Sequence, residues 1–176
     1  MASGSKRRGF ESVGDMVLSL AVVLGVVAVV VLLNLRNDPA PVKTVDYRSA
    51  AVQARSLASY DVLVPDGLGP TWRATSARSE RVGGAVEWHV GFVTPSSAYA
   101  GLEQSDGAAA TFVDRFAEGA RAAGATTLAG RQWRRLEGGR PETRALVSTR
   151  AGVTTVVAGG ASWLELDELA GSLRGA

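Results

Sequence analysis

The longest uninterrupted apolar stretch of the chain lies near its start, at residues 16–35. Residues 16–33 contain no charge, no proline and one polar side chain, that of Ser19. A helix of 20 residues rises about 30 Å, which matches the hydrocarbon thickness of a bilayer. A signal peptide has a shorter apolar region, of about 7–15 residues, followed by a small-residue cleavage site. The pattern therefore predicts an uncleaved, single-pass transmembrane helix at residues 16–35.

The segments on either side of this stretch are predicted to contribute little to a packed core. Residues 1–15 are expected to form a short tail of Gly, Ser and basic residues. Residues 36–59 are expected to form a linker, which Pro39 and Pro41 stiffen near its start. Within it, the Ala-rich run 45–57 predicts a short helix. The folded domain is therefore expected to cover residues 60–176.

Alternating apolar and polar positions predict strands in the first half of this domain. The alternation is clearest at residues 86–93, where Trp88, Val90 and Phe92 are separated by polar or small residues. Further strands are predicted at residues 60–64, 72–82 and 99–104. Gly83 and Gly84 have the composition of a hairpin turn between two of them.

After residue 108 the hydrophobic period becomes that of a helix, which extends through residue 123. Asp106 is its predicted N-cap and Gly124 its predicted stop. Three more strands are predicted at residues 126–136, 143–150 and 153–158. Ser162 and Glu165 then have the spacing of a capping box, which starts a final helix. This order predicts an α+β domain, in which an antiparallel sheet packs against two helices.

Charge is unevenly distributed along the chain. Residues 1–60 carry seven Lys and Arg against four Asp and Glu, whereas residues 61–176 carry twelve against thirteen. A nearly neutral domain argues against a nucleic-acid partner, and a basic segment beside a span suits anionic lipid headgroups. The basic cluster at residues 6–8 favours a cytoplasmic N-terminus, although four basic residues also follow the span by residue 55. Long domains translocate largely regardless of charge, so we expect an extracytoplasmic domain at the cell membrane.

Few residues suggest catalysis or metal binding. His89 is the only histidine and the chain has no cysteine, so we expect neither a zinc site nor any other cofactor. His89 could serve as a proton shuttle or metal ligand, but the favoured interpretation is a polar residue on the outward face of a strand, paired with whichever groups lie nearby. Ser162 lies in a Gly-rich run, yet Leu164 replaces the final glycine of a nucleophile elbow, and helix capping explains this serine better. We therefore predict no catalytic residues.

The strongest candidates for a binding surface are arginines in the second half of the domain. Some of them could converge on adjacent strands into an anion-binding face, although a solvated sheet surface is the favoured interpretation. The candidate binding residues are Arg131, Arg134 and Arg135, together with His89. The wider group adds Arg140, Arg144 and Arg150. The four tryptophans are expected in the core: Trp72, Trp88, Trp133 and Trp163.

Several segments resemble a known family. They are the run from Tyr60 to Ser76, which contains the turn Pro65-Asp66-Gly67, the segments 88–94 and 99–105, and the ending 157–166 with its helix. These segments are similar to domain of unknown function 4245, a family of uncharacterised actinobacterial membrane proteins. The resemblance covers nearly all of residues 16–176. It implies a single N-terminal span and an outward-facing domain, and it implies no established activity.

These observations favour a membrane-anchored, envelope-facing domain with a non-enzymatic binding or protein-interaction role. Its expected partners are the lipid bilayer and a membrane or envelope protein. One alternative is an envelope hydrolase that uses His89 or a carboxylate. Another alternative is an accessory subunit of a membrane complex.

Overall fold

The computed structural model describes residues 8–35, 44–139 and 143–175, with the side chains of residues 8–15, 30 and 32–35 excepted. The chain divides into two compact units, one of residues Met1–Pro41 and one of residues Val42–Ala176. The second unit therefore begins well before residue 60, where the pattern of strands places the start of the domain.

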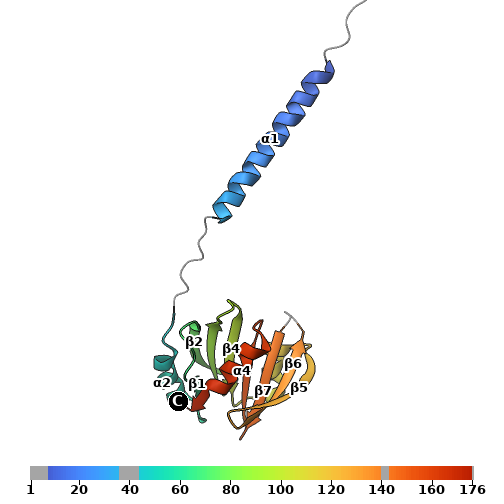
Figure 1. The fold of residues 1–176 in the computed structure, drawn as a ribbon. Coiled ribbons are helices and arrows are strands. Elements are labelled where there is room, and N and C mark those ends of the chain that lie inside the picture. The colour runs from blue at the N-terminus through green and yellow to red at the C-terminus, as the bar shows by residue number, and fades with distance from the viewer. Residues whose placement is uncertain (1–7, 36–43, 140–142, 176) are drawn as a thin grey trace, which may run out of the picture. The chain divides into compact units, whose positions relative to one another are not determined.

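The first unit contains a single long helix, α1, Arg8–Leu35 (Figure 1). It begins eight residues before the predicted span, inside the segment expected to be a tail. Its described apolar side chains are exposed, among them those of Met16, Leu20 and Val27. Within the described part of the chain, no helix combines the length and the apolar character needed to cross a membrane. The transmembrane helix at residues 16–35 is therefore not confirmed and stays a prediction.

The second unit opens with helix α2, Tyr47–Leu57. The side chain of Asp46 caps it by accepting hydrogen bonds from the backbone N–H groups of Arg48 and Ser49. Ala51 and Ala54 are buried among the core residues of the unit. The helix expected in a linker therefore forms part of the folded unit.

A seven-stranded antiparallel sheet, in the order β2-β3-β4-β8-β7-β6-β5, forms the centre of this unit. The strands are β2 Arg73–Val82, β3 Ala85–Val93, β4 Tyr99–Ser105, β5 Arg121–Leu128, β6 Arg131–Gly138, β7 Thr143–Arg150 and β8 Val153–Gly159. A separate pair joins β1, Leu63–Pro65, to β9, Leu173–Gly175. Helices α3, Ala109–Ala117, and α4, Trp163–Ser172, complete the unit. The α+β class with an antiparallel sheet is confirmed.

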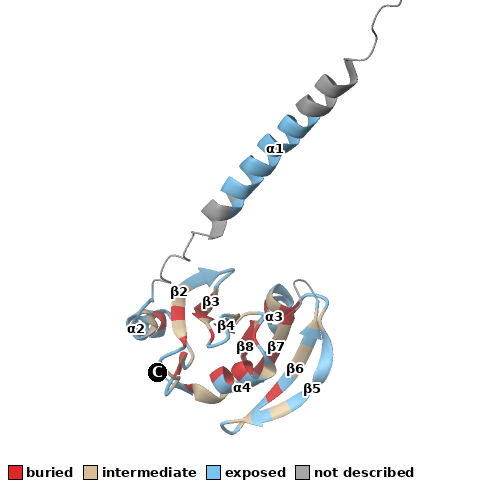
Figure 2. Cartoon of the chain, turned by 45° about the horizontal axis from the view of Figure 1, so that its top comes forward, coloured by how far each residue is buried: buried red, intermediate tan, exposed pale blue. Residues whose placement is uncertain are grey.

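The two faces of the sheet support different cores, because successive side chains of a strand point to opposite faces. The larger core packs β3, β4, β7 and β8 against α2 and α4, and it contains Trp88, Phe92 and Leu146. The smaller core packs α3 on β7 and β8 and contains Phe112 and Val156. Figure 2 shows that buried residues concentrate on the central strands, whereas the β5–β6 hairpin is largely exposed.

Two turns that the sequence patterns do not predict change the second half of the fold. The strand expected over residues 126–136 is instead the end of β5 and the start of β6, joined at Ala129 and Gly130, which both have positive φ. The helix expected through residue 123 ends at Ala117, followed by Gly119 with φ +71°. Residues 121–123 therefore belong to β5, and Gly124, the predicted helix stop, lies at a bulge of that strand.

The predictions for helix starts have opposite outcomes. Asp106 does not cap α3; its side chain accepts the backbone N–H of Val86 at 2.8 Å instead. The capping box at Ser162 and Glu165 is confirmed, with both reciprocal hydrogen bonds present at the start of α4. The final apolar residue of the predicted helix, Leu173, starts β9 and pairs with Pro65.

The two edges of the large sheet are irregular. The outer strand β5 carries the bulge between Ala122 and Gly124, and Gly124 has φ +112°. The opposite edge strand, β2, carries charged side chains, including Arg78 and Glu80. One of its backbone carbonyls, that of Ala74, accepts a hydrogen bond from the backbone N–H of Val45. Neither edge therefore presents a regular row of free backbone groups over its whole length.

Candidate functional site

A hollow in the second unit lies where β6 begins and β7 ends. It has a volume of about 760 Å³, and its lining includes Tyr60, Gln104, Arg131 and Arg150. A neighbouring hollow of about 410 Å³ shares Arg131 and Arg150 and adds Arg174. We call these two hollows, which share lining residues, the basic cavity.

Local turns place the two main arginines side by side. Arg131 is the first residue of β6, directly after the Ala129-Gly130 turn. Arg150 is the last residue of β7, directly before a second turn with positive φ at its first position, Ala151. Since β6 and β7 pair in antiparallel fashion, the start of one lies beside the end of the other. Both guanidinium groups therefore reach the same cavity.

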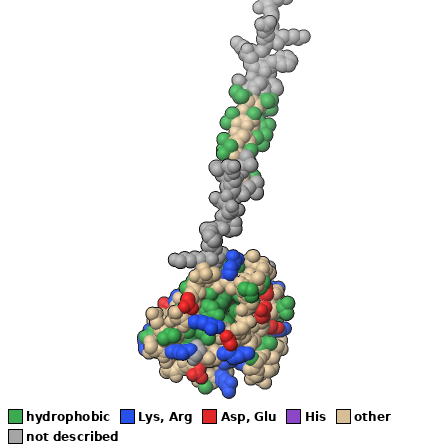
Figure 3. Space-filling model, turned by 60° about the vertical axis from the view of Figure 1, so that its left-hand side comes forward, with side chains coloured by type: hydrophobic (Ala, Val, Ile, Leu, Met, Phe, Trp, Pro, Cys, Tyr) green, Lys and Arg blue, Asp and Glu red, His purple; other side chains and the backbone are tan. Residues whose placement is uncertain are grey.

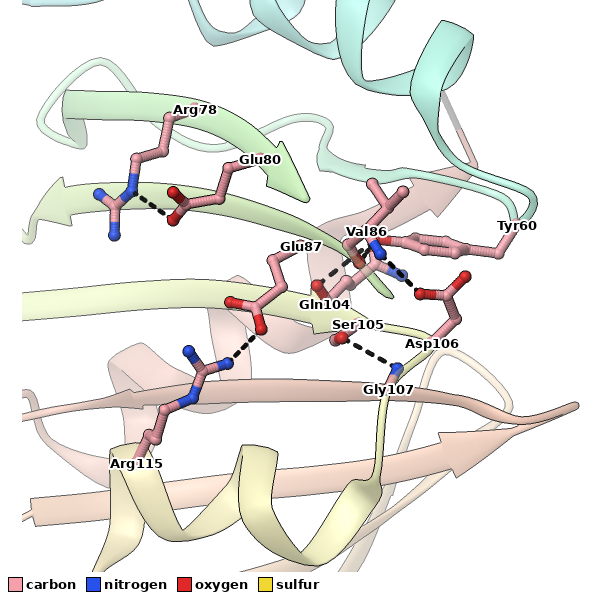
Figure 4. A network of polar contacts seen from close by, with 10 residues as sticks. All are labelled: Tyr60, Arg78, Glu80, Val86, Glu87, Gln104, Ser105, Asp106, Gly107 and Arg115. Carbon is pink, nitrogen blue, oxygen red and sulfur yellow. Dashed lines mark hydrogen bonds and ion pairs between the residues drawn. The ribbon is translucent and has the colours of Figure 1, made fainter. Parts of the chain in front are cut away.

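Hydrogen bonds fix the part of the cavity lining that contains Tyr60 and Gln104. The Tyr60 hydroxyl donates to the backbone carbonyl of Val86 at 3.0 Å, close to the Asp106 carboxylate (Figure 4). The buried Gln104 side chain accepts the backbone N–H of Leu63 at 2.6 Å. Burial, followed by the nearby carboxylates, raises the pKa of Tyr60, which keeps this hydroxyl neutral. This part of the lining is therefore rigid and uncharged apart from exposed Asp61.

Among the residues that the structure describes, Arg131 and Arg150 of the basic cavity have no acidic partner. Burial, and then the neighbouring Arg150 guanidinium, lower the pKa of Arg131, so the two cations repel each other. Among the described residues, neither of them makes an ion pair. Arg131 instead lies over the ring of Trp133, at 5.9 Å from its centroid. Elsewhere the unit presents basic and acidic side chains near one another, as on the face drawn in Figure 3.

The other arginines of the predicted group do not join this cavity. Arg134 points to the opposite sheet face, where it lines a hollow beside α3. Arg135 pairs with Asp167 of α4 and stacks on Trp163. Arg144 pairs with Glu137 at 3.0 Å. Arg140 lies outside the described residues. The structure therefore brings together Arg131 and Arg150 and separates Arg134 and Arg135 from them.

A second polar cluster crosses three adjacent strands, and we call it the His89 row. Ser76 of β2 lies with its Oγ 2.8 Å from Nε2 of His89 on β3. Nδ1 of the same imidazole lies 2.5 Å from Oε1 of Glu103 on β4. His89 and Glu103 are each 7% exposed, whereas Ser76 is half-buried. His89 therefore lies on the strand face away from the larger core and is paired with neighbouring side chains, but it is almost fully buried.

Two glycines make room for the His89 row. A Cβ at Gly91 would lie 2.5 Å from the Ser76 Oγ and 3.2 Å from the Tyr99 hydroxyl. A Cβ at Gly101 would lie 2.9 Å from the same hydroxyl and 3.3 Å from Oε1 of Glu103. The Tyr99 phenol therefore lies over both glycines, next to the ends of the row. Burial, and then the charge of Glu103, raise the pKa of this phenol.

The hydrogen bonds of the row determine which tautomer of His89 fits. Burial raises the pKa of Glu103, and the hydrogen bond from His89 opposes that shift. When the carboxylate accepts the Nδ1 proton, Nε2 is left as an acceptor for the Ser76 hydroxyl. The sequence patterns do not single out Ser76, Tyr99 or Glu103. The register of the hairpin around Pro95 would have indicated Glu103 as a partner of His89, because it places the two residues directly opposite each other.

Other sequence features have structural roles. Glu165 caps α4 and also accepts the backbone N–H of Ser96 at 3.1 Å. Trp72, Trp88 and Trp133 are buried, and Trp163 is partly buried against the same core. No group of three or more His, Cys, Asp or Glu side chains suited to a metal ion occurs within the described residues.

The chain matches a family model over residues 8–173. No curated protein matches it. The actinobacterial source and the single span that the resemblance implies stay predictions. Since the match covers most of the chain, including α1 and both polar clusters, the chain belongs to the family described as "Protein of unknown function (DUF4245)".

Proposed function

We propose that the second unit is a binding module that holds an anionic group of its ligand in the basic cavity. The observation that carries this proposal is the pair formed by Arg131 and Arg150, which share one cavity without an acidic partner among the described residues. The role that we propose is recognition: the cavity presents two guanidinium groups, and the Ser59 hydroxyl, which also lines it, donates a hydrogen bond to Asp106.

The electrostatics of the pair favour an anion. A partly buried guanidinium loses hydration, and a second cation nearby adds repulsion. A phosphate or carboxylate placed between the Arg131 and Arg150 guanidinium groups would offset their repulsion. Its oxygens would accept two N–H hydrogen bonds from each guanidinium. The rigid wall at Tyr60 and Gln104 leaves the cavity shaped before a ligand arrives, which lowers the entropic cost of binding.

The proposal also assigns a role to the first unit, as an anchor that keeps the module at the cell membrane with the module outside. The apolar run at residues 16–35 and the exposed apolar side chains of α1 support it. Because the chain has no cysteine, one introduced at exposed Glu118 would be the only thiol. A membrane-impermeant maleimide should label E118C in intact cells. Labelling only after lysis would contradict the outward orientation, and recovery of the chain in the soluble fraction would contradict the anchor.

The binding proposal is tested by ligand-dependent stability of the full chain in mild detergent. Inorganic phosphate and citrate, titrated at constant ionic strength, should raise the melting temperature with saturation, because binding to the folded state stabilises it. The double variant Arg131→Gln/Arg150→Gln should lose most of this response. The matched control, Arg121→Gln/Arg134→Gln, removes the same charge outside the cavity and should respond as the native chain does. Equal responses in both double variants, or no saturable response in the native chain, would refute anion binding here.

A further inference from the structure

We propose that Ser76 is a nucleophile, activated by His89 and oriented through Glu103, and that the His89 row hydrolyses small carboxylic esters. This activity is separate from anion binding, because the row lies on the sheet face opposite the basic cavity. That placement follows from alternation along β3 and β4, where Trp88 and Leu102 belong to the larger core and His89 and Glu103 point the other way.

The first argument is the order of the hydrogen bonds. In a catalytic triad the nucleophile is hydrogen-bonded to the base, and the base is hydrogen-bonded to an orienting carboxylate. The heavy atoms of each hydrogen bond lie about 2.6–3.2 Å apart. Ser76 Oγ to His89 Nε2 measures 2.8 Å, and His89 Nδ1 to Glu103 Oε1 measures 2.5 Å. Both ring nitrogens are used, so the imidazole cannot rotate without losing two contacts.

The second argument is the gradient of burial along the row. Glu103 and His89 are almost fully buried, while Ser76 lies on edge strand β2 and is half-buried. A base that is shielded from water keeps its tautomer, and a nucleophile near the surface can meet a substrate. A His–carboxylate pair with a purely structural role would not require a serine hydroxyl such as that of Ser76 on the second ring nitrogen.

The third argument is the hydrogen-bond donor beside Ser76. The Ser76 Oγ and the Tyr99 hydroxyl both lie within 3.2 Å of the point that a Cβ of Gly91 would occupy. A Cβ at position 91 would therefore crowd the serine and the tyrosine, and one of them would have to shift. The Tyr99 hydroxyl, whose raised pKa keeps it protonated, is placed to donate a hydrogen bond to an oxyanion that forms next to Ser76.

The chemistry balances with water as the second reactant. The Ser76 Oγ forms a bond to the ester carbonyl carbon, and its proton passes to Nε2 of His89. The tetrahedral intermediate then breaks its bond to the leaving alkoxide, which takes that proton from His89 and departs as an alcohol. Water attacks the acyl-serine, its proton passes through His89 back to Ser76, and a carboxylic acid is released. Glu103 stays ionised throughout and holds the Nδ1 proton.

The test uses the folded full chain in mild detergent and a fluorophosphonate, which forms a Ser Oγ–P bond with loss of fluoride. Peptide mapping should find the adduct on Ser76. Ser76→Ala should abolish that adduct, while Ser79→Ala, three residues along the same strand, should label as the native chain does. His89→Gln should slow labelling at least 100-fold, and p-nitrophenyl acetate hydrolysis should fall in parallel.

Glu103→Gln provides a second variant in case His89→Gln does not fold. It should slow labelling at least tenfold. An unchanged melting curve is the criterion that the variant is folded. An absence of adduct on Ser76 in the native chain would overturn the proposal. So would a labelling rate that folded His89→Gln and Glu103→Gln variants leave unchanged, because the serine would then react without a base.

Discussion

The basic cavity and the His89 row lie on opposite faces of one sheet. They differ in whether their ionisable side chains have partners. In the cavity, Arg131 and Arg150 face each other without an acidic partner among the described residues. In the row, Glu103 and His89 are almost fully buried, and each has its hydrogen-bond partner. An unpaired charge at a concave surface favours a ligand, whereas a paired charge in a buried row favours a fixed geometry. The following changes test this difference, from the largest expected effect to the smallest.

Replacement of His89 by Ala should destabilise the unit by about 3 kcal/mol, because it leaves the buried Glu103 carboxylate without its partner. Urea denaturation followed by tryptophan fluorescence measures the loss. Arg121→Ala, at an exposed position of β5, is the control and should change the free energy of unfolding little. A cost below about 1 kcal/mol for His89→Ala would show that Glu103 does not depend on this pair.

Replacement of Gly91 by Ala should cost about 2 kcal/mol, because the new methyl group would lie 2.5 Å from the Ser76 Oγ. The melting temperature measures this cost. Gly160→Ala is the matched control, since a Cβ there meets nothing within 4 Å. Equal melting temperatures for the two variants would contradict this prediction, because they would show that the His89 row accommodates a methyl group at position 91 without cost.

The two buried glutamates, Glu103 and Glu165, should respond to pH in opposite directions. Burial opposes ionisation of Glu165, but hydrogen bonds from Thr94, Ser96 and Ser162 lower its pKa from 4.5 to about 2. Its contribution is therefore present above pH 4.5 and lost as the pH falls through about 2. The pKa of Glu103 is raised, so its contribution is present below 4.5 and lost as the pH rises through the raised value.

Replacement of Glu165 by Gln should therefore cost about 1 kcal/mol at neutral pH, the typical value of a helix cap, and less in acid. The free energy of unfolding, measured by urea titration at a series of pH values, should converge with that of the native chain near pH 2. Parallel curves at every pH would contradict a lowered pKa for this residue.

The single change Arg131→Gln should have the smallest effect on stability, between no change and a gain of about 0.5 kcal/mol. It removes one of two mutually repelling cations and breaks no described ion pair. Thermal denaturation at low salt measures it. A loss above about 1 kcal/mol would show that Arg131 supports the fold through its contact with Trp133.

Much of the fold could be predicted from local patterns. The alternation around Trp88 and the capping box at Ser162 both correspond to observed elements. The sequence does not indicate the Ala129-Gly130 turn, because alanine seldom adopts positive φ and this dipeptide is therefore a poor turn signal. The apolar spacing does not indicate the end of α3, because it continues through Ala120 and Ala123 although the chain has already turned at Gly119.

The candidate site was harder to predict because it depends on pairing between strands. Arg131, Arg134 and Arg135 are near neighbours in sequence, but alternation along β6 sends Arg134 to the other face. Asp167 neutralises Arg135 from a helix more than thirty residues away. His89 could be evaluated only with its cross-strand neighbours, Ser76 and Glu103, and these depend on the register of two hairpins. Local patterns therefore predict the elements, and register determines which charges are paired.

The irregular edges of the large sheet have a consequence for crowding. Copies of an anchored protein would diffuse in a plane and meet at high local concentration, where exposed strands can join edge to edge. The bulge at Gly124 twists β5 away from a straight partner, and the charges of Arg78 and Glu80 on β2 disfavour a second apolar strand. Both edge strands of the sheet therefore disfavour pairing with the sheet of a second copy.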